Sequence, residues 1–283
     1  MSGLTLTPER EFLGTKIGGK NPFFLIAGPC VIENEELLDV VAQKLKELSQ
    51  KWGLLIVFKS SYDKANRSSI RSYRGPGLEE GLKLLAQVKK KYGLPLLTDV
   101  HWPHEVEKAA EVVDVLQIPA FLCRQTDLLI EAARSGRWTN VKKGQFIAPL
   151  DALQILDKFY QVGTDKVFLC ERGYSFGYNN LIVDMRNFEL LRRHKVHMVF
   201  DATHSTQLPG GGEVSGGQRE MAFPLARAAC AAGVDGLFFE VHPNPPEAKS
   251  DATNQIYLSW LEGIIEKLLS IDALVKERIH ANS

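Results

Sequence analysis

The sequence predicts an α/β fold, a single closed (β/α)8 barrel, and three observations favour that fold class. Short apolar runs alternate with longer segments of helical periodicity, which implies a parallel sheet. Eight such strand–helix units can be recognised along the 283 residues, a count and a length typical of this barrel. No long linker rich in Pro and Gly interrupts the chain. We therefore expect one domain over residues 1–283, with an open doubly wound sheet as the structural alternative.

The eight units follow one another in a regular order. The strands are expected at the apolar runs rich in β-branched and aromatic residues, namely Phe23–Ala27, Leu54–Lys59, Leu96–Val100, Val113–Ile118, Val141–Phe146, Lys166–Cys170, Val196–Asp201 and Gly236–Val241. The helices are expected at Asn34–Trp52, Leu78–Tyr92, Pro103–Val112, Thr126–Ser135, Ala152–Val162, Leu181–His194, Glu220–Ala232 and Gln255–Ser270. Glycine is a helix-stop signal, and it follows five of these helices, at Gly53, Gly93, Gly136, Gly163 and Gly233.

Residues 1–22 do not fit this repeat. The segments Leu4–Leu6 and Phe12–Ile17 are separated by Pro8. We predict that they form a small hairpin that closes the bottom of the barrel.

Composition excludes several classes of function. Lys and Arg together number 34, as do Asp and Glu, so no global basic field attracts nucleic acid or a membrane surface. The chain lacks the run of about 18 apolar residues that a membrane span needs. The segment Met1–Glu11 lacks the basic and apolar blocks of a signal peptide. Together with scattered cysteines at Cys30, Cys123, Cys170 and Cys230, this predicts a cytoplasmic protein.

Polar residues gather where the predicted strands end. The clusters are Pro29-Cys30, Lys59-Ser60-Ser61, Asp99-Val100-His101, Gln117, Lys142-Lys143, Glu171-Arg172, Asp201 to His204 and Glu240-Val241-His242. A single cluster of this kind is usually a solvated strand end. In a barrel, all eight ends converge on the face that carries the active site, so we expect these side chains to form one functional site.

A metal site is expected from side chains that follow the first, seventh and eighth strands. Its predicted ligands are Cys30, His204, Glu240 and, in the loop after the last strand, Asp251. A thiolate, an imidazole and two carboxylates suit Fe(II), Zn(II), Mn(II) or Co(II) better than Mg(II). Taken alone, Cys30 reads as an ordinary buried cysteine and His204 as a surface or substrate-contacting histidine. The hypothesis therefore depends on the barrel.

Cations on the same face predict an anion site. They are Lys59, Lys64, Arg67, Lys142, Lys143 and Arg172. The segment from Lys64 to Ser69 mixes charge with hydroxyl and amide donors, as a phosphate cradle needs, although a solvated basic loop would read the same way. The glycine-rich loop from Gly210 to Gly217 follows His204 and is a candidate lid.

Several longer motifs carry a family resemblance. They are Ile26-Ala-Gly-Pro-Cys30, the segment from Phe58 to Ser69, the segment from Leu116 to Asp127, Asn140-Val-Lys-Lys-Gly-Gln-Phe146, the segment from Glu171 to Asn180, and Asp201-Ala-Thr-His-Ser205. Through them the chain resembles the 3-deoxy-D-manno-octulosonate 8-phosphate synthases from about Phe23 to Leu269.

The resemblance implies a reaction, a cofactor and an assembly. Members of this family condense phosphoenolpyruvate, arabinose 5-phosphate and water to an eight-carbon sugar acid phosphate used in lipopolysaccharide synthesis. They are homotetramers of barrels and divide into metal-dependent and metal-independent classes. The metal-independent class has Asn where this chain has Cys30. The presence of Cys30 with His204, Glu240 and Asp251 is similar to the metal-dependent class.

The resemblance also implies roles for individual residues. Lys142 and Arg172 would hold phosphoenolpyruvate. The residues expected alongside them are Lys64, Ser61 and Gln117. Lys59 and Asp99 would face the reacting end of the sugar. The sugar phosphate would contact Asn66, Arg67 and Ser68, of which Arg67 and Ser68 would reach the site of a neighbouring subunit. The groups expected to act in catalysis are Lys59, Lys64, Asp99 and His204.

Three other functions stay open at this point. A related synthase uses erythrose 4-phosphate, but its loop after the second strand typically reads Lys-Pro-Arg-Thr, whereas here it reads Lys-Ala-Asn-Arg-Ser-Ser from Lys64. A class I aldolase would form a Schiff base on Lys142 or Lys59. A barrel that binds a metabolite without catalysis is the third possibility.

Overall fold

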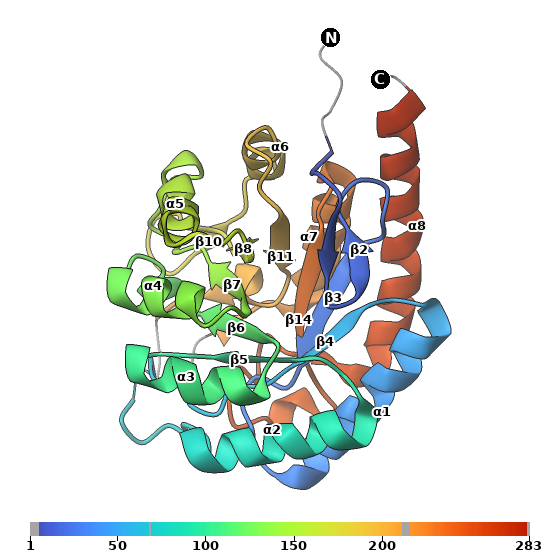
Figure 1. The fold of residues 1–283 in the computed structure, drawn as a ribbon. Helices are drawn as coiled ribbons and strands as arrows, with labels where there is room; N and C mark the ends of the chain where they lie inside the picture. The colour runs from blue at the N-terminus through green and yellow to red at the C-terminus, as the bar shows by residue number, and fades with distance from the viewer. Residues whose placement is uncertain (1–5, 68, 211–215, 282–283) are drawn as a thin grey trace.

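The computed structural model describes residues 6–67, 69–210 and 216–281. A closed barrel of eight parallel strands lies inside a ring of helices, which confirms the predicted fold class (Figure 1). The barrel strands, in chain order, are β3 (Phe24–Gly28), β4 (Ile56–Lys59), β5 (Leu96–Asp99), β6 (Val115–Ile118), β7 (Trp138–Lys142), β8 (Val167–Glu171), β11 (Met198–Asp201) and β14 (Gly236–His242). Pairing of β14 with both β3 and β11 closes the barrel and rules out the open sheet.

Within the described residues, eight α-helices surround the strands. They are α1 (Glu35–Trp52), α2 (Leu78–Tyr92), α3 (Pro103–Val112), α4 (Thr126–Arg134), α5 (Leu153–Val162), α6 (Arg186–Arg192), α7 (Ala222–Ala232) and α8 (Leu261–Ala281). Three of the expected glycine stops, Gly53, Gly93 and Gly163, end their helices in the left-handed conformation. No helix in the described ranges is long and apolar enough to cross a membrane.

The chain also forms short strands in addition to the eight barrel strands. They are β1 (Arg10–Phe12), β2 (Thr15–Ile17), β9 (Tyr174–Ser175), β10 (Leu181–Ile182), β12 (Gln207–Leu208), β13 (Gly216–Gly217) and β15 (Ile256–Tyr257). Two predicted helices begin later than expected because these strands occupy their first residues. Leu181–Ile182 pairs with β9 before α6 begins, and Ile256–Tyr257 pairs with the end of β14 before α8 begins.

The predicted strand Val141–Phe146 is wrong in its bounds. The strand β7 begins at Trp138 and ends at Lys142. Polar Thr139 and Asn140 are fully buried within it, although they interrupt the apolar pattern that the sequence offers. After Lys142 the chain leaves the barrel as a loop, so the apolar residues that follow do not extend the strand.

The N-terminal hairpin is confirmed, but with different strands. It pairs β1 with β2 through a two-residue turn at Leu13 and Gly14, both with positive φ, as a type I′ turn requires. The expected strand Leu4–Leu6 is wrong for Leu6, which lies in no strand, and Leu4 lies outside the described residues. The Phe12 ring lies 4.9 Å from the Trp138 and Phe168 rings, at the beginnings of β7 and β8. The hairpin therefore closes the amino end of the barrel.

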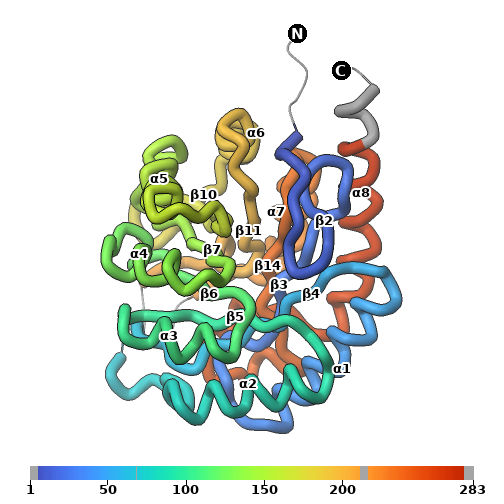
Figure 2. Tube along the Cα trace, in the orientation of Figure 1, coloured from blue at the N-terminus to red at the C-terminus, as the bar shows by residue number. Residues whose placement is uncertain are grey.

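The barrel strands separate two apolar clusters. Inward side chains such as Ile26, Val57 and Phe238 fill the barrel, while outward ones such as Leu25 and Phe58 pack against the helices. The trace of the chain in Figure 2 shows the hairpin and the far part of α8 at the same end of the molecule. The carboxyl ends of the strands, opposite the hairpin, are left to carry the functional site.

Candidate active site

A cavity of about 1020 Å³ opens at the carboxyl ends of the strands. The predicted site residues that line it are Lys59, Lys64, Asn66, Arg67, Asp99, Gln117, Lys142, Arg172, His204 and Asp251. Three more, Cys30, Ser61 and Glu240, are fully buried next to lining residues. Ser68 lies outside the described residues. The structure thus brings together side chains that come from across the whole sequence.

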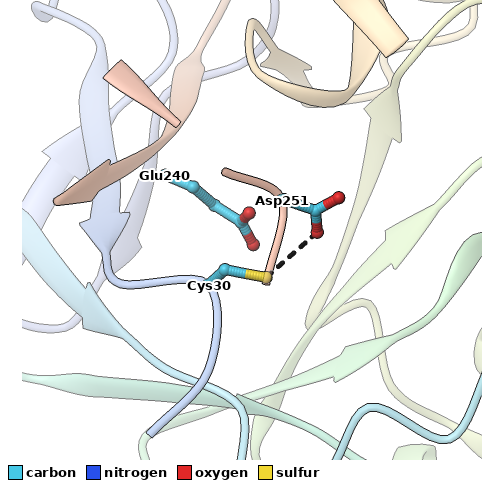
Figure 3. A group of neighbouring side chains, drawn as sticks. All are labelled: Cys30, Glu240 and Asp251. Atoms are coloured by element: carbon cyan, nitrogen blue, oxygen red, sulfur yellow. Dashed lines mark hydrogen bonds between the residues drawn. The ribbon is translucent and has the colours of Figure 1, made fainter. Parts of the chain in front are cut away.

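Three of the four predicted metal ligands, Cys30, Glu240 and Asp251, form one group, and His204 lies beside it. Figure 3 shows Cys30, Glu240 and Asp251 pointing toward one another, and one ligand atom from each lies within 4.8 Å of the others. The Cys30 thiol donates to Asp251 Oδ2 at 3.0 Å. The ring nitrogen Nε2 of His204 lies 3.6 Å from Glu240 Oε2 and 3.9 Å from Asp251 Oδ2.

This cluster fits a cation. Glu240 Oε2 is buried and has no hydrogen-bond partner among the described residues, and a buried unpaired oxygen of this kind is costly. Burial, together with the charges of Glu240 and Asp251, raises the pKa of the Cys30 thiol well above its usual value. A divalent cation bound here would satisfy the oxygen and favour the thiolate.

Asp201 orients His204, a role that the sequence did not reveal. The His204 ring nitrogen Nδ1 lies 2.8 Å from Asp201 Oδ2, and the backbone N–H groups of Thr203 and His204 donate to Oδ1. Although burial disfavours its charge, His204 and Lys142 outweigh that cost and hold the pKa of Asp201 well below its usual range. If Nδ1 donates to this carboxylate, the lone pair of Nε2 faces Glu240 and Asp251. The only hint of this contact in the sequence is that Asp201 precedes His204 by three residues.

Arg172 is a buried cation that pairs with no carboxylate in the described part of the chain. Its guanidinium donates to the side-chain oxygens of Gln145 and Gln207, and no ion pair to Arg172 occurs within the described ranges. Burial lowers the pKa of this guanidinium. By contrast, Lys142 Nζ lies 2.6 Å from Asp201 Oδ2. Arg172 therefore has charge available for an anion, and sequence reasoning had missed the two glutamines that hold it.

A second network surrounds Asp99. Ser61 Oγ donates to one oxygen of Asp99, Gln117 Nε2 donates to the other at 2.6 Å, and Lys64 Nζ lies 3.9 Å away. Although burial disfavours the charged carboxylate, Lys59 and Lys64 hold the pKa of Asp99 well below its usual range. The pKa of Lys64 is raised in spite of burial by the negative charges of Glu240, Asp99 and Asp251. Asp99 and Lys64 are thus both charged.

More cations lie toward the rim. Arg67 Nε donates to the backbone oxygen of Tyr73 at 3.1 Å, while its buried Nη2 has no partner among the described residues. Arg71 and Lys249 line the same cavity. Neither had been singled out from the sequence, because a surface cation and a pocket cation look alike there.

Lys143 departs from the expectation. It was expected among the cations of the pocket face, but it does not line the cavity and is fully buried. Its Nζ lies 3.4 Å from Glu171 Oε1 and 3.5 Å from the centre of the Tyr174 ring. Consecutive residues of an extended chain point in opposite directions, so only Lys142 faces the pocket. The expected lid stays a prediction, because residues 211–215 lie outside the described residues.

Comparison with known proteins shows which family this chain is similar to. The model of the DAHP synthetase I family matches residues 5–277. A protein of Fusobacterium nucleatum named 2-dehydro-3-deoxyphosphooctonate aldolase is 54% identical over 260 residues, 92% of this chain and 94% of its own. Proteins of the same name from Geobacter sp. (strain M21) and Pelobacter propionicus are 53% and 55% identical, each over 96% of this chain and 100% of their own.

Proposed function

Because the chain belongs to the DAHP synthetase I family, we propose that it condenses phosphoenolpyruvate with D-arabinose 5-phosphate and water. The products are 3-deoxy-D-manno-octulosonate 8-phosphate and phosphate. The observation that carries this proposal is similarity over more than nine-tenths of the chain to relatives named 2-dehydro-3-deoxyphosphooctonate aldolase. The chain is thus an enzyme, a transferase that forms a carbon–carbon bond.

Two anionic substrates must meet in one cavity, and the charge pattern supports this. Carbon 3 of phosphoenolpyruvate attacks the aldehyde carbon of the open-chain sugar, water adds to carbon 2, and the hemiketal phosphate then loses phosphate by breaking its carbon–oxygen bond. Arg172 and Lys142 hold phosphoenolpyruvate, with Gln117, Ser61 and Lys64 beside it. Holding both reactants in register replaces a bimolecular encounter, and fixed cations stabilise charge that develops on oxygen.

The sugar occupies the other part of the cavity in this proposal. Its phosphate contacts Asn66, Arg67 and Ser68, and its aldehyde end faces Lys59 and Asp99. A volume of about 1020 Å³ is large for a single small ligand and leaves room for two phosphorylated substrates.

The second part of the proposal is a divalent metal held by Cys30, His204, Glu240 and Asp251. When bound, the metal supplies Lewis acidity beside the reacting groups. The unpaired oxygen of Glu240 and the mixed sulfur, nitrogen and oxygen donor set support Fe, Zn, Mn or Co. We also propose that the enzyme is a cytoplasmic homotetramer. The free thiols of all four cysteines support a reducing compartment.

The class I aldolase alternative is disfavoured by ion pairing. A Schiff base needs a neutral lysine. Lys142 Nζ lies 2.6 Å from Asp201, and Lys59 Nζ lies 2.6 Å from Glu240. Although burial lowers it, the pKa of Lys142 is raised overall, chiefly by Asp201.

Phosphate release from phosphoenolpyruvate tests the reaction. The purified enzyme is given phosphoenolpyruvate alone, with arabinose 5-phosphate, and with erythrose 4-phosphate. We expect rapid release only with arabinose 5-phosphate. Release with erythrose 4-phosphate would instead assign the related synthase activity, and trapping by borohydride that survives chelation would assign a class I aldolase.

Cys30→Ala tests the metal. We expect loss of bound metal and of most activity. Cys230→Ala, which removes another buried thiol away from the cavity, should keep both. Full activity of Cys30→Ala in the presence of a chelator would refute the metal proposal. Cys30→Asn introduces the residue of the metal-independent class and should retain part of the activity without metal.

A further inference from the structure

We infer that Gln207 couples the anion site to the metal site, so that a phosphate anion and a divalent cation strengthen each other's binding. This inference rests on the proposed function, because it takes Arg172 as the anion site and Asp251 as a metal ligand. Among the described residues, Gln207 is the one whose side chain contacts both: its Oε1 accepts from Arg172 Nη2 at 2.5 Å, and its Nε2 donates to Asp251 Oδ1 at 3.1 Å.

The charges of the two neighbours dictate how the Gln207 amide points. A guanidinium only donates hydrogen bonds, and a carboxylate only accepts them. If the amide turned over, two donors would face each other at Arg172 and two acceptors would face each other at Asp251. The amide therefore has one favourable orientation, and a shift of either neighbour is passed to the other.

Asp251 presents its two oxygens to different partners. Oδ1 accepts from Gln207, while Oδ2 accepts from the Cys30 thiol at 3.0 Å and lies 3.9 Å from His204 Nε2. Asp251 also has a positive φ of 46°, a conformation that few residues other than glycine adopt. A cation held by Oδ2 would restrict the whole carboxylate and, through Oδ1, the amide of Gln207.

Arg172 keeps donors for an anion after this contact. A guanidinium has five N–H donors. Nη1 contacts Gln145 and Nη2 contacts Gln207, with a longer contact of 3.5 Å from Nη2 to the backbone oxygen of His204. Gln145 and Gln207 hold the two terminal nitrogens of the Arg172 guanidinium. Restricting Gln207 therefore also fixes the orientation of the guanidinium plane, and with it the direction in which the remaining N–H donors point.

The coupling follows from ordering. A ligand that orders a side chain lowers the entropic cost for a second ligand that needs the same order. Such coupling is reciprocal, and typical values change affinity by about 5- to 150-fold. Direct attraction between cation and anion adds to it, so the share that depends on Gln207 must be isolated by substitution.

Gln207→Met and Gln145→Met form a matched pair for this purpose. Both replace a glutamine on Arg172 by an apolar side chain of similar length, but only Gln207 also contacts a predicted metal ligand. The affinity of inorganic phosphate is measured by calorimetry on the metal-free and the Co(II)-loaded enzyme, and the ratio of the two is the coupling factor. Co(II) affinity with and without phosphate gives the reciprocal value.

In the unsubstituted enzyme we expect Co(II) to tighten phosphate binding at least about fivefold. Gln207→Met should lower that factor at least about threefold. Gln145→Met should weaken phosphate binding in both forms and leave the factor unchanged. The inference is overturned, and the proposed function is left standing, if Gln207→Met keeps the coupling factor of the unsubstituted enzyme. The same conclusion follows if Gln207→Met loses phosphate affinity equally in the metal-free and the Co(II)-loaded enzyme. Failure of the unsubstituted enzyme to bind Co(II) or phosphate overturns the proposed site and the inference with it.

Discussion

Asp201 shows how a single residue acts on the site through another. Asp201 contacts the Nδ1 side of the His204 ring, and Nε2 faces the carboxylates of Glu240 and Asp251. Carboxylates that orient a metal-binding histidine in this way typically contribute about 10- to 100-fold to metal affinity. In the proposed metal site, Asp201 is therefore a positioning residue.

Asp201→Asn should therefore weaken metal binding by about 10- to 100-fold, measured by competition with a chelator. Asp184→Asn is the matched control, because Asp184 pairs with Arg186 on the surface and should not affect the metal. Equal metal affinity in Asp201→Asn and the unsubstituted enzyme would contradict the assigned role.

The environment of Glu105 predicts that the free energy of unfolding depends on pH. Although burial disfavours its charge, hydrogen bonds from His101 and from the Tyr62 hydroxyl lower the pKa of Glu105 from 4.5 to about 2. A carboxyl with a lower pKa in the folded state stabilises the fold above its unfolded pKa, and this contribution is lost as the pH falls through the folded pKa. The window therefore runs from about pH 4.5 down to about pH 2.

Glu105→Gln should be less stable than the unsubstituted enzyme at neutral pH, and the difference should shrink across that window. Urea denaturation between about pH 2.5 and 7 measures it. The unsubstituted enzyme, measured beside the variant at each pH, provides the reference. A difference that stays constant with pH would exclude this contribution from Glu105.

At the scale of elements, the hairpin of β1 and β2 predicts a separation of stability from activity. Phe12 is almost fully buried and packs against Phe24, Trp138 and Phe168 at the amino ends of their strands. Phe12→Ala should lower the free energy of unfolding by about 3–5 kcal/mol. The KM values should not change, because the cavity lies at the opposite ends of the strands.

Urea denaturation and steady-state kinetics on the same preparation test this. Phe12→Leu keeps much of the apolar volume and should lose less stability. Large changes in KM in Phe12→Ala would show that the hairpin also affects the shape of the cavity.

Gly28 illustrates a constraint between two strands. A Cβ added at Gly28 would lie 1.9 Å from the backbone oxygen of Lys59, which no real contact allows. Because Cys30 follows β3 and Lys59 ends β4, Gly28→Ala should both destabilise the barrel and weaken metal binding, measured by urea denaturation and chelator competition. Gly263→Ala is the control, since its Cβ would meet nothing within 4 Å and should leave metal binding unchanged.

At the scale of the whole molecule, the proposed tetramer raises the question of which subunit completes each site. Arg67 lines the cavity of its own chain, whereas the family resemblance implied a reach into a neighbouring subunit. Light scattering should give about four times the mass of one chain if the proposed tetramer forms.

Mixed assemblies of Arg67→Ala and Arg172→Ala subunits separate the two readings of Arg67. If each site is completed within one chain, activity should be no higher than that of the separate variants, because Arg67 and Arg172 line the same cavity. Recovery of activity in the mixture would show instead that Arg67 of one subunit serves the site of another.

The sequence alone determined the number and order of the strand–helix units. It also determined that the candidate site residues lie at the carboxyl ends of the strands. Apolar periodicity and glycine stops are local signals, and the carboxyl ends of barrel strands meet whatever their loops contain. That is why Cys30, Glu240 and Asp251, far apart in the chain, could be placed together in advance.

Only the tertiary structure decided which way side chains point and what they contact. The register of β7 sends Lys142 into the cavity and Lys143 away from it. The roles of Asp201, Gln145 and Gln207 depend on hydrogen bonds to residues brought close by folding. Such contacts are long-range and directional, so no local pattern of residues encodes them.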